Sequence, residues 1–516
     1  MSFTDYLFLP AFGLLSLLYF NVQKRHQWII LLCASLVFYS SWGGLQIFWM
    51  AGEVLVAWAF GLWISHLQQK SASALGERTW ESRKEKMAFQ KAERKKWRRV
   101  LVPSILLILA SLVLVKVNKL VSFGGISFIV PLGISYYTLS LVGYLADVYW
   151  RKEQAEKNPF RLLLFAAYFP KIIEGPISKH RDTAAQMFQP HAFDYRRYCF
   201  GLQRALWGYF KKLVIADRLA IFVDSVYGVY DEQRGAILLL AAIASALQMY
   251  CDFSGCMDIA LGISDALGIT LEENFNHPFF SRSVGEFWRR WHMSLNSWFR
   301  DYVFMPIVVS PSFIRRSGKL QKKLGKETGK AVMNILPLLL VWLMTGLWHG
   351  TGWNYLLWGA YWAVLMILSS LLERPMKKLT ALLKIPTQSR VWRAWQCART
   401  FVLFTICRII AGQSSVGAAW TIFRTIVTDF APLSLTTGIL LEQGLNLAEL
   451  IGILLLLMFL WFVSARQEKG VVFREKIAAL PIVPRWTVYF LAIFFVLIFG
   501  IYGATYDAAS FVYQGF

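Results

Sequence analysis

Long apolar runs, separated by short polar segments rich in lysine and arginine, dominate this chain. Several runs approach the roughly 20 residues that an α-helix needs to cross a bilayer. The clearest are Trp28–Tyr39, Ala51–Ile64, Val102–Val115, Gly235–Met249, Leu336–Trp348, Ala360–Leu372, Leu450–Val463 and Trp486–Thr505. The pattern predicts an all-α polytopic membrane protein with about 10–12 transmembrane helices, accompanied by re-entrant and interfacial helices.

The run Ala331–Leu372 predicts a hairpin of two transmembrane arms. Basic and acidic residues bound it at both ends, and each arm is about 20 residues long. The turn formers of Trp348–Gly352 then fall at the far end of the hairpin, where the glycines permit a tight backbone. His349 lies in this turn, at a depth where an ionisable residue is costly.

The segment Glu286–Pro306 is too polar to cross lipid unaided. Its aromatic positions recur at i, i+3, i+4 and i+7, which predicts a single helix with one aromatic stripe. The stripe comprises Trp288, Trp291, His292, Leu295, Trp298, Phe299 and Tyr302, and the remaining surface carries Arg289, Arg290, Asn296, Arg300 and Asp301. Such a helix suits the inner membrane interface or the wall of a water-filled cavity. The alternative is an interfacial anchor with no chemical task.

Composition and charge support a membrane protein. Hydrophobic residues make up 56% of the 516 residues, and the mean hydropathy is +0.46. The net charge of +23 lies in loops between apolar runs, which indicates membrane topology and argues against nucleic acid binding. The positive-inside rule predicts a cytoplasmic location for the basic loops and an outer location for Asp224–Gln233, Asp429–Glu449 and both termini.

The organisation is predicted to be one domain over residues 1–516, since no repeat of 20 to 50 residues is visible. One polar insertion, residues 67–99, has mixed charge and many helix formers. It predicts a cytoplasmic helix near anionic headgroups, or alternatively a solvated connector. Six cysteines show no paired spacing, so neither a disulfide framework nor a metal site is expected.

Polar residues within apolar segments are candidates for chemistry. Tyr250, Asp252, Ser254 and Asp258 interrupt one run, and His349 ends another. The carboxylates of Asp252 and Asp258 are costly in lipid unless they line a cavity or pair with arginines. A histidine that takes and returns a proton near neutral pH is suited to acyl transfer onto a hydroxyl. The alternative for His349 is a structural histidine, hydrogen-bonded inside a helix bundle.

Several motifs resemble the membrane-bound O-acyltransferase family, in its branch of alginate O-acetyltransferases and teichoic-acid D-alanyl transferases. The resemblance covers residues 130–360. It rests on Phe287–Leu295 with Asp301-Tyr302 and Pro306, Gly346–Gly350 with Trp353-Asn354 and Trp358-Gly359, Tyr250–Gly255, Asn274–Pro278, Phe169-Pro170 and Gly175-Pro176. Where a typical member has a tyrosine and a serine before the second aspartate, this chain has Cys256-Met257 before Asp258.

The resemblance implies a ring of helices around a thin core, with a tunnel joining an inner donor site to an outer acceptor site. It makes His349 the general base and His292 a second catalytic histidine. Residues expected along the substrate path are Trp288, Arg289, Trp291, Asn296, Arg300, Asp301, Tyr250, Asp252, Ser254 and Asn354. The tail, residues 506–516, resembles the aromatic C-terminal motif of this branch, in which Tyr513 corresponds to a tyrosine thought to carry the acyl group. The alternative for this tail is an aromatic membrane anchor.

The expected function is acetyl transfer from cytoplasmic acetyl-CoA, across a bacterial inner membrane, to a cell-surface polysaccharide such as alginate or peptidoglycan. No bound cofactor or metal is expected. The expected partners are acetyl-CoA, membrane lipids and an extracytoplasmic acyltransferase that passes the group on. D-alanyl transfer to teichoic acid is the alternative within the enzyme class. A transporter or flippase of lipid-linked sugars is the alternative from another class.

Overall fold

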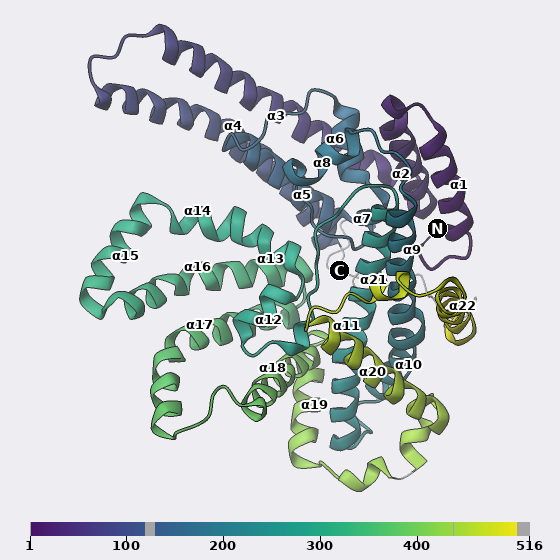
Figure 1. Ribbon diagram of the computed structural model, residues 1–516. Coiled ribbons are helices and arrows are strands. Elements are labelled where there is room, and N and C mark those ends of the chain that lie inside the picture. The colour runs from purple at the N-terminus through teal and green to yellow at the C-terminus, as the bar shows by residue number, and fades with distance from the viewer. Residues whose placement is uncertain (1, 119–129, 437, 503–516) are drawn as a thin grey trace. The chain divides into compact units, whose positions relative to one another are not determined.

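A computed structural model describes residues 2–118, 130–436 and 438–502 of the chain (Figure 1). Within this described part, eight helices are long and apolar enough to cross a membrane, and two shorter apolar helices, α1 (Phe8–Asn21) and α19 (Val416–Thr428), accompany them. The same residues contain no strand, and their single β-bridge pairs Phe275 with Trp291. The all-α polytopic prediction is confirmed, whereas the ring of helices and the tunnel stay predictions.

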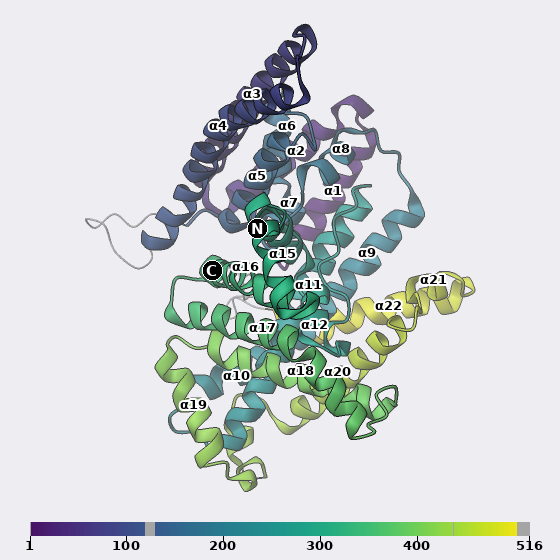
Figure 2. The same cartoon turned by 90° about the vertical axis from the view of Figure 1, so that its left-hand side faces the viewer.

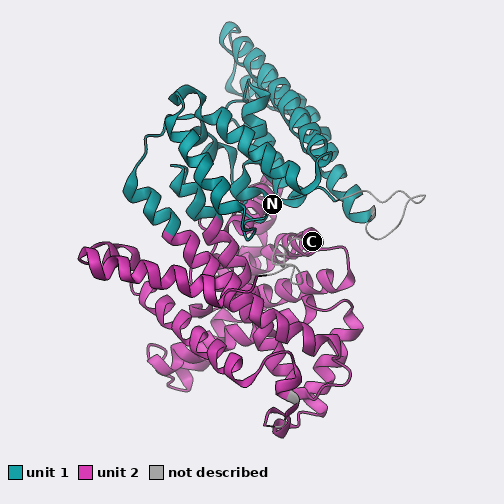
Figure 3. Ribbon diagram, turned by 90° about the vertical axis from the view of Figure 1, so that its right-hand side faces the viewer, with its two compact units in different colours: residues 1–202, 260–272 teal, residues 203–259, 273–516 magenta. Residues whose placement is uncertain are grey.

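The helices form two compact units (Figure 3), unit 1 with residues 1–202 and 260–272 and unit 2 with residues 203–259 and 273–516. Two helices, α9 (Tyr195–Tyr209) and α11 (Gly235–Ala266), continue from one unit into the other. The division therefore does not test the prediction of a single domain.

Unit 1 carries the N-terminal spans. Besides α1, its helices are η1 (Lys24–His26), α2 (Gln27–Gly43), α3 (Gln46–Glu77), α4 (Arg83–Asn118), α5 (Ile134–Tyr149), α6 (Pro159–Ala167), α7 (Phe169–Ile172) and α8 (His180–Phe188). Helix α5 is buried along almost its whole length, so it forms the core of this unit.

The polar insertion lies at the end of the α3–α4 pair, whose helices run side by side (Figure 2). Residues 67–99 are helical except for a turn at 78–82. A hydrogen bond from Ser71 to Glu93 and an ion pair between Arg78 and Glu85 join the two arms. The insertion is helical because its residues continue α3 and α4, and its location at the cytoplasmic headgroups stays a prediction.

Unit 2 carries the segments with predicted chemistry. Its helices besides α19 are η2 (Phe210–Ala216), α10 (Asp217–Gly228), η3 (Pro278–Phe280), α12 (Val284–Arg290), α13 (Met293–Phe299), η4 (Arg300–Phe304), α14 (Met305–Val308), α15 (Pro311–Leu324), α16 (Lys326–His349), α17 (Trp353–Leu382), α18 (Arg390–Ala411), η5 (Pro432–Leu435), η6 (Gly438–Glu442), α20 (Leu447–Gln467), α21 (Phe473–Ala478) and α22 (Ile482–Phe499). Two of them, η2 and η4, are π-helical.

The predicted hairpin is confirmed as α16 and α17, which pack against each other (Figure 1). Glycines allow their close approach. A Cβ atom at Gly346 would lie 2.5 Å from the carbonyl oxygen of Tyr355, and one at Gly359 would lie 2.5 Å from that of Trp342. Small residues let helix backbones approach closely in membranes, so these glycines fix the position of the turn that carries His349.

A second close crossing joins α9 to α11 within unit 2. A Cβ atom at Gly208 would lie 2.5 Å from the carbonyl oxygen of Gly255, and one at Gly255 would lie 2.9 Å from that of Gly208. Because the backbones nearly touch there, the polar side chains one turn away on each helix are held within reach of one another.

Candidate active site

His349 is the last residue of α16 and is buried, with 5% of its surface exposed. Its ring contacts two indoles edge-to-face, that of Trp348 at 4.8 Å and that of Trp358 at 4.9 Å between centroids. The turn 350–352 connects it to α17, so both helices of the hairpin build its surroundings.

His292 lies between α12 and α13, where the predicted single aromatic helix is interrupted. Its backbone is left-handed, with φ +46°, and its neighbour Trp291 pairs with Phe275 in the antiparallel bridge. The single-helix prediction is wrong because the chain gains other hydrogen bonds here: Met293 N donates to Asn274 O, and Asn276 N donates to Arg290 O.

Two asparagine side chains stabilise this break between α12 and α13 through hydrogen bonds. The Nδ2 group of Asn296 lies 2.8 Å from Trp288 O, 2.7 Å from Trp291 O and 3.1 Å from His292 O. These carbonyls lie in the last turn of α12 and in the break that follows it, so their hydrogen-bonding capacity is satisfied without a continuous helix. Asn296, predicted on the substrate path, therefore supports the backbone around His292.

The Oδ1 atom of Asn274 accepts hydrogen bonds from Ser294 N and Oγ and lies 3.2 Å from His292 Nδ1. Because this oxygen only accepts, His292 donates through Nδ1 and presents the lone pair of Nε2. Burial lowers the pKa of His292 to about 3, so its imidazole is neutral at physiological pH.

Both histidines contact the same indole. The ring of Trp348, which contacts His349, lies 6.1 Å from that of His292, and Phe253 of α11 packs edge-on against His292 at 4.8 Å. The structure thus brings together two predicted catalytic residues that are 57 positions apart in the sequence.

Tryptophans surround the hairpin side of this site. The ring of Trp288 lies 4.6 Å from that of Trp342, 5.0 Å from that of Trp362 and 5.9 Å from that of Trp358. Trp291 packs against Phe404 at 4.7 Å. Trp288 thus lies in the aromatic cluster beside His349, whereas Trp291 packs onto α18.

The polar residues of α11 divide between two sides of the helix. Ser254 accepts a hydrogen bond from Lys211 Nζ at 2.8 Å, and Asp258 pairs with the same lysine at 2.7 Å. Asp252 instead pairs with Lys212 at 2.6 Å, and Lys212 also contacts Asp217 at 2.9 Å. Consecutive lysines of the π-helix η2 therefore reach different carboxylates.

No role was predicted for Lys211 and Lys212, although they interrupt an apolar stretch. Both are almost completely buried, at 3% and 2% exposure. Ionisable residues in such a position are rare and usually paired. That signal predicts buried acidic partners, and Asp252 and Asp258 were already recognised as costly in lipid.

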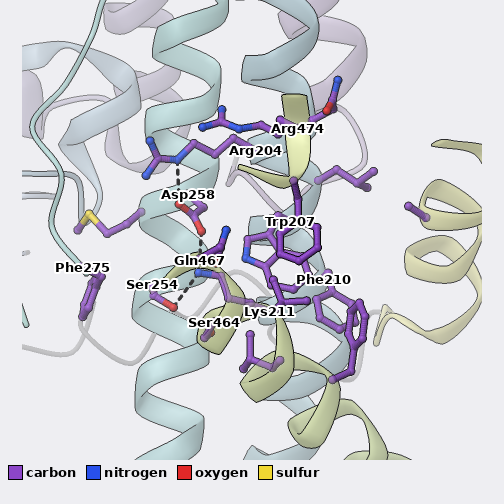
Figure 4. Close-up of a pocket in the computed structure, with 18 of the residues that line it drawn as sticks. Arg204, Trp207, Phe210, Lys211, Ser254, Asp258, Phe275, Ser464, Gln467 and Arg474 are labelled. Carbon is purple, nitrogen blue, oxygen red and sulfur yellow. Dashed lines mark hydrogen bonds and ion pairs between the residues drawn. The ribbon is translucent and has the colours of Figure 1, made fainter. Parts of the chain in front are cut away.

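A cavity of about 1050 Å³ lies in unit 2 (Figure 4). Two predicted residues, Tyr250 and Ser254, line it, as do Asn274 and Met293 next to His292. The remaining lining comes from α9, η2, α11, the segment 273–277 and the helices α20, α21 and α22. His349 does not line this cavity.

Other predicted residues lie elsewhere. Asn354 donates a hydrogen bond to Gln413 O at 2.9 Å and so anchors the start of α17. Arg289 and Arg300 are exposed and do not line the cavity, and Arg300 pairs with Asp301 at 2.8 Å. Their place on the substrate path stays a prediction.

Tyr513 lies outside the described residues. In the part of the chain that is described, no group of three or more His, Cys, Asp or Glu side chains is placed to hold a metal ion.

Comparison with known proteins shows the family of this chain. The sequence pattern of MBOAT, the membrane-bound O-acyltransferase family, matches residues 79–416. The probable alginate O-acetylase AlgI of Azotobacter vinelandii is 31% identical over 434 residues, covering 82% of this chain and 76% of that protein.

Two further relatives carry different names. The peptidoglycan O-acetyltransferase of Helicobacter pylori is 28% identical over 357 residues, 64% of this chain and 60% of that protein. The teichoic acid D-alanyltransferase of Bacillus subtilis is 33% identical over 265 residues, 51% of this chain and 62% of that protein. The family pattern spans more than half of a multi-pass membrane chain whose two motif histidines meet at one indole, and this chain is therefore an acyltransferase that belongs to the membrane-bound O-acyltransferase family.

Proposed function

We propose that this enzyme takes an acetyl group from acetyl-CoA on the cytoplasmic side of a bacterial inner membrane and delivers it outward for O-acetylation of a cell-surface polysaccharide such as alginate or peptidoglycan. The observation that carries the proposal is the meeting of His349 and His292 at Trp348, in a chain whose relatives include O-acetylases of both polymers. The cytoplasmic basic loops attract the anionic nucleotide of the donor.

In the proposed reaction, His349 takes the proton of an acceptor hydroxyl while the oxygen attacks the thioester carbonyl. The carbon–sulfur bond then breaks, and the coenzyme A thiolate leaves and accepts a proton. General base catalysis of this kind contributes roughly 10²–10⁴-fold to the rate. No bound cofactor or metal takes part in this scheme.

His292 has a positioning role in the proposal. A neutral imidazole with a pKa of about 3 is a weak base, but its Nε2 lone pair and fixed ring orient a neighbouring donor group. The hydrogen bond to Asn274 keeps that orientation. This supports His349, rather than His292, as the proton acceptor.

Tyr513 is proposed as the first acceptor. Its phenol follows the last span, α22, on a short tether, and a tethered hydroxyl has a high effective concentration. A phenyl ester is also a good acyl donor, because the phenol pKa of about 10 makes it a better leaving group than an alkyl alcohol. An extracytoplasmic acyltransferase would then move the acetyl group to the polysaccharide.

D-alanyl transfer to teichoic acid is the second candidate, because a D-alanyltransferase matches half of the chain at 33% identity. Acetyl transfer is favoured because the alginate O-acetylase match covers 82% of the chain. The transporter alternative is set aside, since the chain belongs to an acyltransferase family.

The test uses purified protein in nanodiscs with labelled acetyl-CoA. Free coenzyme A and an acetyl mass on the peptide Phe511–Phe516 are expected, and Tyr513→Phe should remove the peptide label while leaving protein abundance unchanged. Label transfer from a D-alanyl carrier protein, but not from acetyl-CoA, would support the second candidate instead. An unlabelled tail with full polysaccharide acetylation would overturn the relay.

A further inference from the structure

Helix α15 has a strongly basic face to which the acyl-transfer proposal gives no role. Five cations recur at spacings of one, three and four residues, which places them on one side of the helix: Arg315, Arg316, Lys319, Lys322 and Lys323. All five side chains are exposed, and the helix contains no aspartate or glutamate. This side of α15 therefore presents a dense positive charge.

The protein itself does not neutralise these cations. Among the described residues, no acidic side chain pairs with any of the five, and their one side-chain hydrogen bond joins Arg315 Nε to Pro311 O at 3.3 Å. Like charges four residues apart on a helix repel each other, as Arg315 does Lys319 and Lys319 does Lys323. An external anionic surface would relieve this repulsion.

The opposite face of α15 packs against α16. Apolar and small residues at helical spacing form it: Phe313, Ser317, Leu320 and Leu324. Ser317 is buried and accepts a hydrogen bond from Gln321 Nε2 at 2.8 Å, and a Cβ atom at Gly329 of α16 would lie 2.5 Å from Gln321 Cα. The helix is therefore amphipathic, and the span that follows it fixes its orientation.

Helix α15 lies at the end of α16 that is opposite to His349. Gly325, with φ +83°, turns the chain between the two helices, and α15 lies across the N-terminal end of α16 (Figure 1). Because α16 is a candidate membrane span, the positive-inside rule predicts this end at the cytoplasmic face. Two apolar side chains of α15 are exposed there, Ile314 at 57% and Leu324 at 42%. Exposed apolar residues beside a cationic face are typical of a helix in the membrane interface.

We propose that α15 is an interfacial helix that binds anionic phospholipids of the inner leaflet, with Ile314 and Leu324 in the acyl region and the five cations at headgroup depth. Charge complementarity supports a lipid, since each cation near an anionic leaflet strengthens binding by about fivefold. The nucleotide of the acyl donor fits less well. Helix α16 has 24 residues, so an anion at α15 is held about 36 Å from His349.

Lipid contact at α15 has a consequence for the hairpin. Because α15 packs on the first turns of α16, headgroups that hold α15 also hold the inner end of the span whose outer end carries His349. Phosphatidylglycerol should therefore raise the melting temperature of the full chain above its value in phosphatidylcholine alone.

Spin labelling of the full chain in nanodiscs tests the proposal. A label on Ile314→Cys, in a background without the native cysteines, reports depth through its accessibility to oxygen and to a water-soluble nickel chelate. The label should lie in the acyl region when the bilayer contains phosphatidylglycerol and should be shallower in phosphatidylcholine alone. The combined variant Arg316→Gln, Lys319→Gln and Lys323→Gln should lose this difference.

Two matched controls separate charge from position. Exchanging each of the three cations for the other basic residue keeps the charge and should keep the lipid-dependent depth. Lys84→Gln, Lys86→Gln and Lys91→Gln remove the same charge from exposed positions of α4 and should also keep it. A label that is equally deep in both lipids, or that does not respond to neutralisation of α15, would overturn the proposal.

A second measurement needs no cysteine replacement. The melting temperature of wild type should be higher with phosphatidylglycerol than without it, and high salt, which screens exposed charges, should remove the difference. Equal melting in the two lipids would contradict the proposal. A rise in the KM for acetyl-CoA on neutralisation of α15, equal in both lipids, would instead assign the cations to the donor. Absence of acetyl-CoA turnover would contradict the proposed function, whereas the label depth and the melting temperature would still decide the role of α15.

Discussion

At the residue scale, His349 is distinguished by its contacts with two indoles at the end of a membrane helix. His349→Ala is expected to lower acetyl transfer by roughly 10²–10⁴-fold, because it removes the general base. Coenzyme A release at equal protein level measures this loss. His349→Gln, which keeps a polar side chain, should be equally inactive, and wild-type turnover in either variant would contradict the assignment.

His292→Ala is expected to impair transfer less than His349→Ala, since a neutral histidine with a pKa of about 3 positions a group but does not take its proton. The same release assay, run on both variants in parallel, measures the difference. A loss as complete as that at position 349 would make the two histidines proton-transfer partners.

The pH dependence of stability also reports on His292. Its pKa falls from 6.5 to about 3 on burial, so between these values the unfolded chain binds a proton that the folded chain does not. The contribution of neutral His292 to the free energy of unfolding is fully present above about pH 6.5 and is lost as pH falls toward 3. Melting temperatures of His292→Gln should therefore decline less on acidification than those of wild type, and parallel curves would argue against a buried neutral imidazole.

At the element scale, the α16–α17 hairpin depends on its glycines. Gly346→Leu would bring a side chain into the carbonyl of Tyr355, and overpacking of this kind typically costs about 1–3 kcal/mol. Thermal unfolding should show the loss, accompanied by reduced activity as the His349 turn shifts. Gly318→Leu is the control, because nothing lies within 4 Å of a Cβ atom there. Equal melting temperatures of the two variants would show that the close approach of α16 and α17 does not contribute to stability.

The same two motif segments show how far sequence predicts structure. The hairpin was predictable because apolar length and glycine position are local properties, and the turn between α16 and α17 falls at the expected residues, although α17 continues to Leu382. The break at His292 could not be predicted, because its hydrogen bonds come from Asn274 and Asn276, which are distant in the sequence. Helical periodicity carries no information about hydrogen-bond partners that are distant in the sequence.

The buried ion pairs were also not predictable from the sequence alone. Asp252 and Asp258 were recognised as costly polar residues, but their partners Lys212 and Lys211 were not. Consecutive lysines of the π-helix η2 point to different sides and reach different carboxylates just after the Gly208–Gly255 crossing of α9 and α11. Neither the π-helix nor the crossing follows from composition.

At the scale of the whole molecule, the proposed function depends on the direction of acetyl transfer across the membrane. Single cysteines at Asp231 and Leu441 should be labelled from outside by an impermeant thiol reagent, whereas those at Lys322 and Thr387 should react only after the membrane is opened. All four positions are exposed, so burial does not explain a difference. A background without the native cysteines provides the control, and the reverse labelling pattern would overturn the proposed direction.

The most direct test of the central claim is acetyl transfer across a sealed membrane. Inside-out vesicles carrying the protein would receive labelled acetyl-CoA on the exposed cytoplasmic face, and label would be measured on Tyr513 after removal of external donor. We predict that wild type transfers acetyl groups to the tail on the lumenal side and that His349→Ala does not. Absence of lumenal label in wild type, or equal label in His349→Ala, would contradict the account.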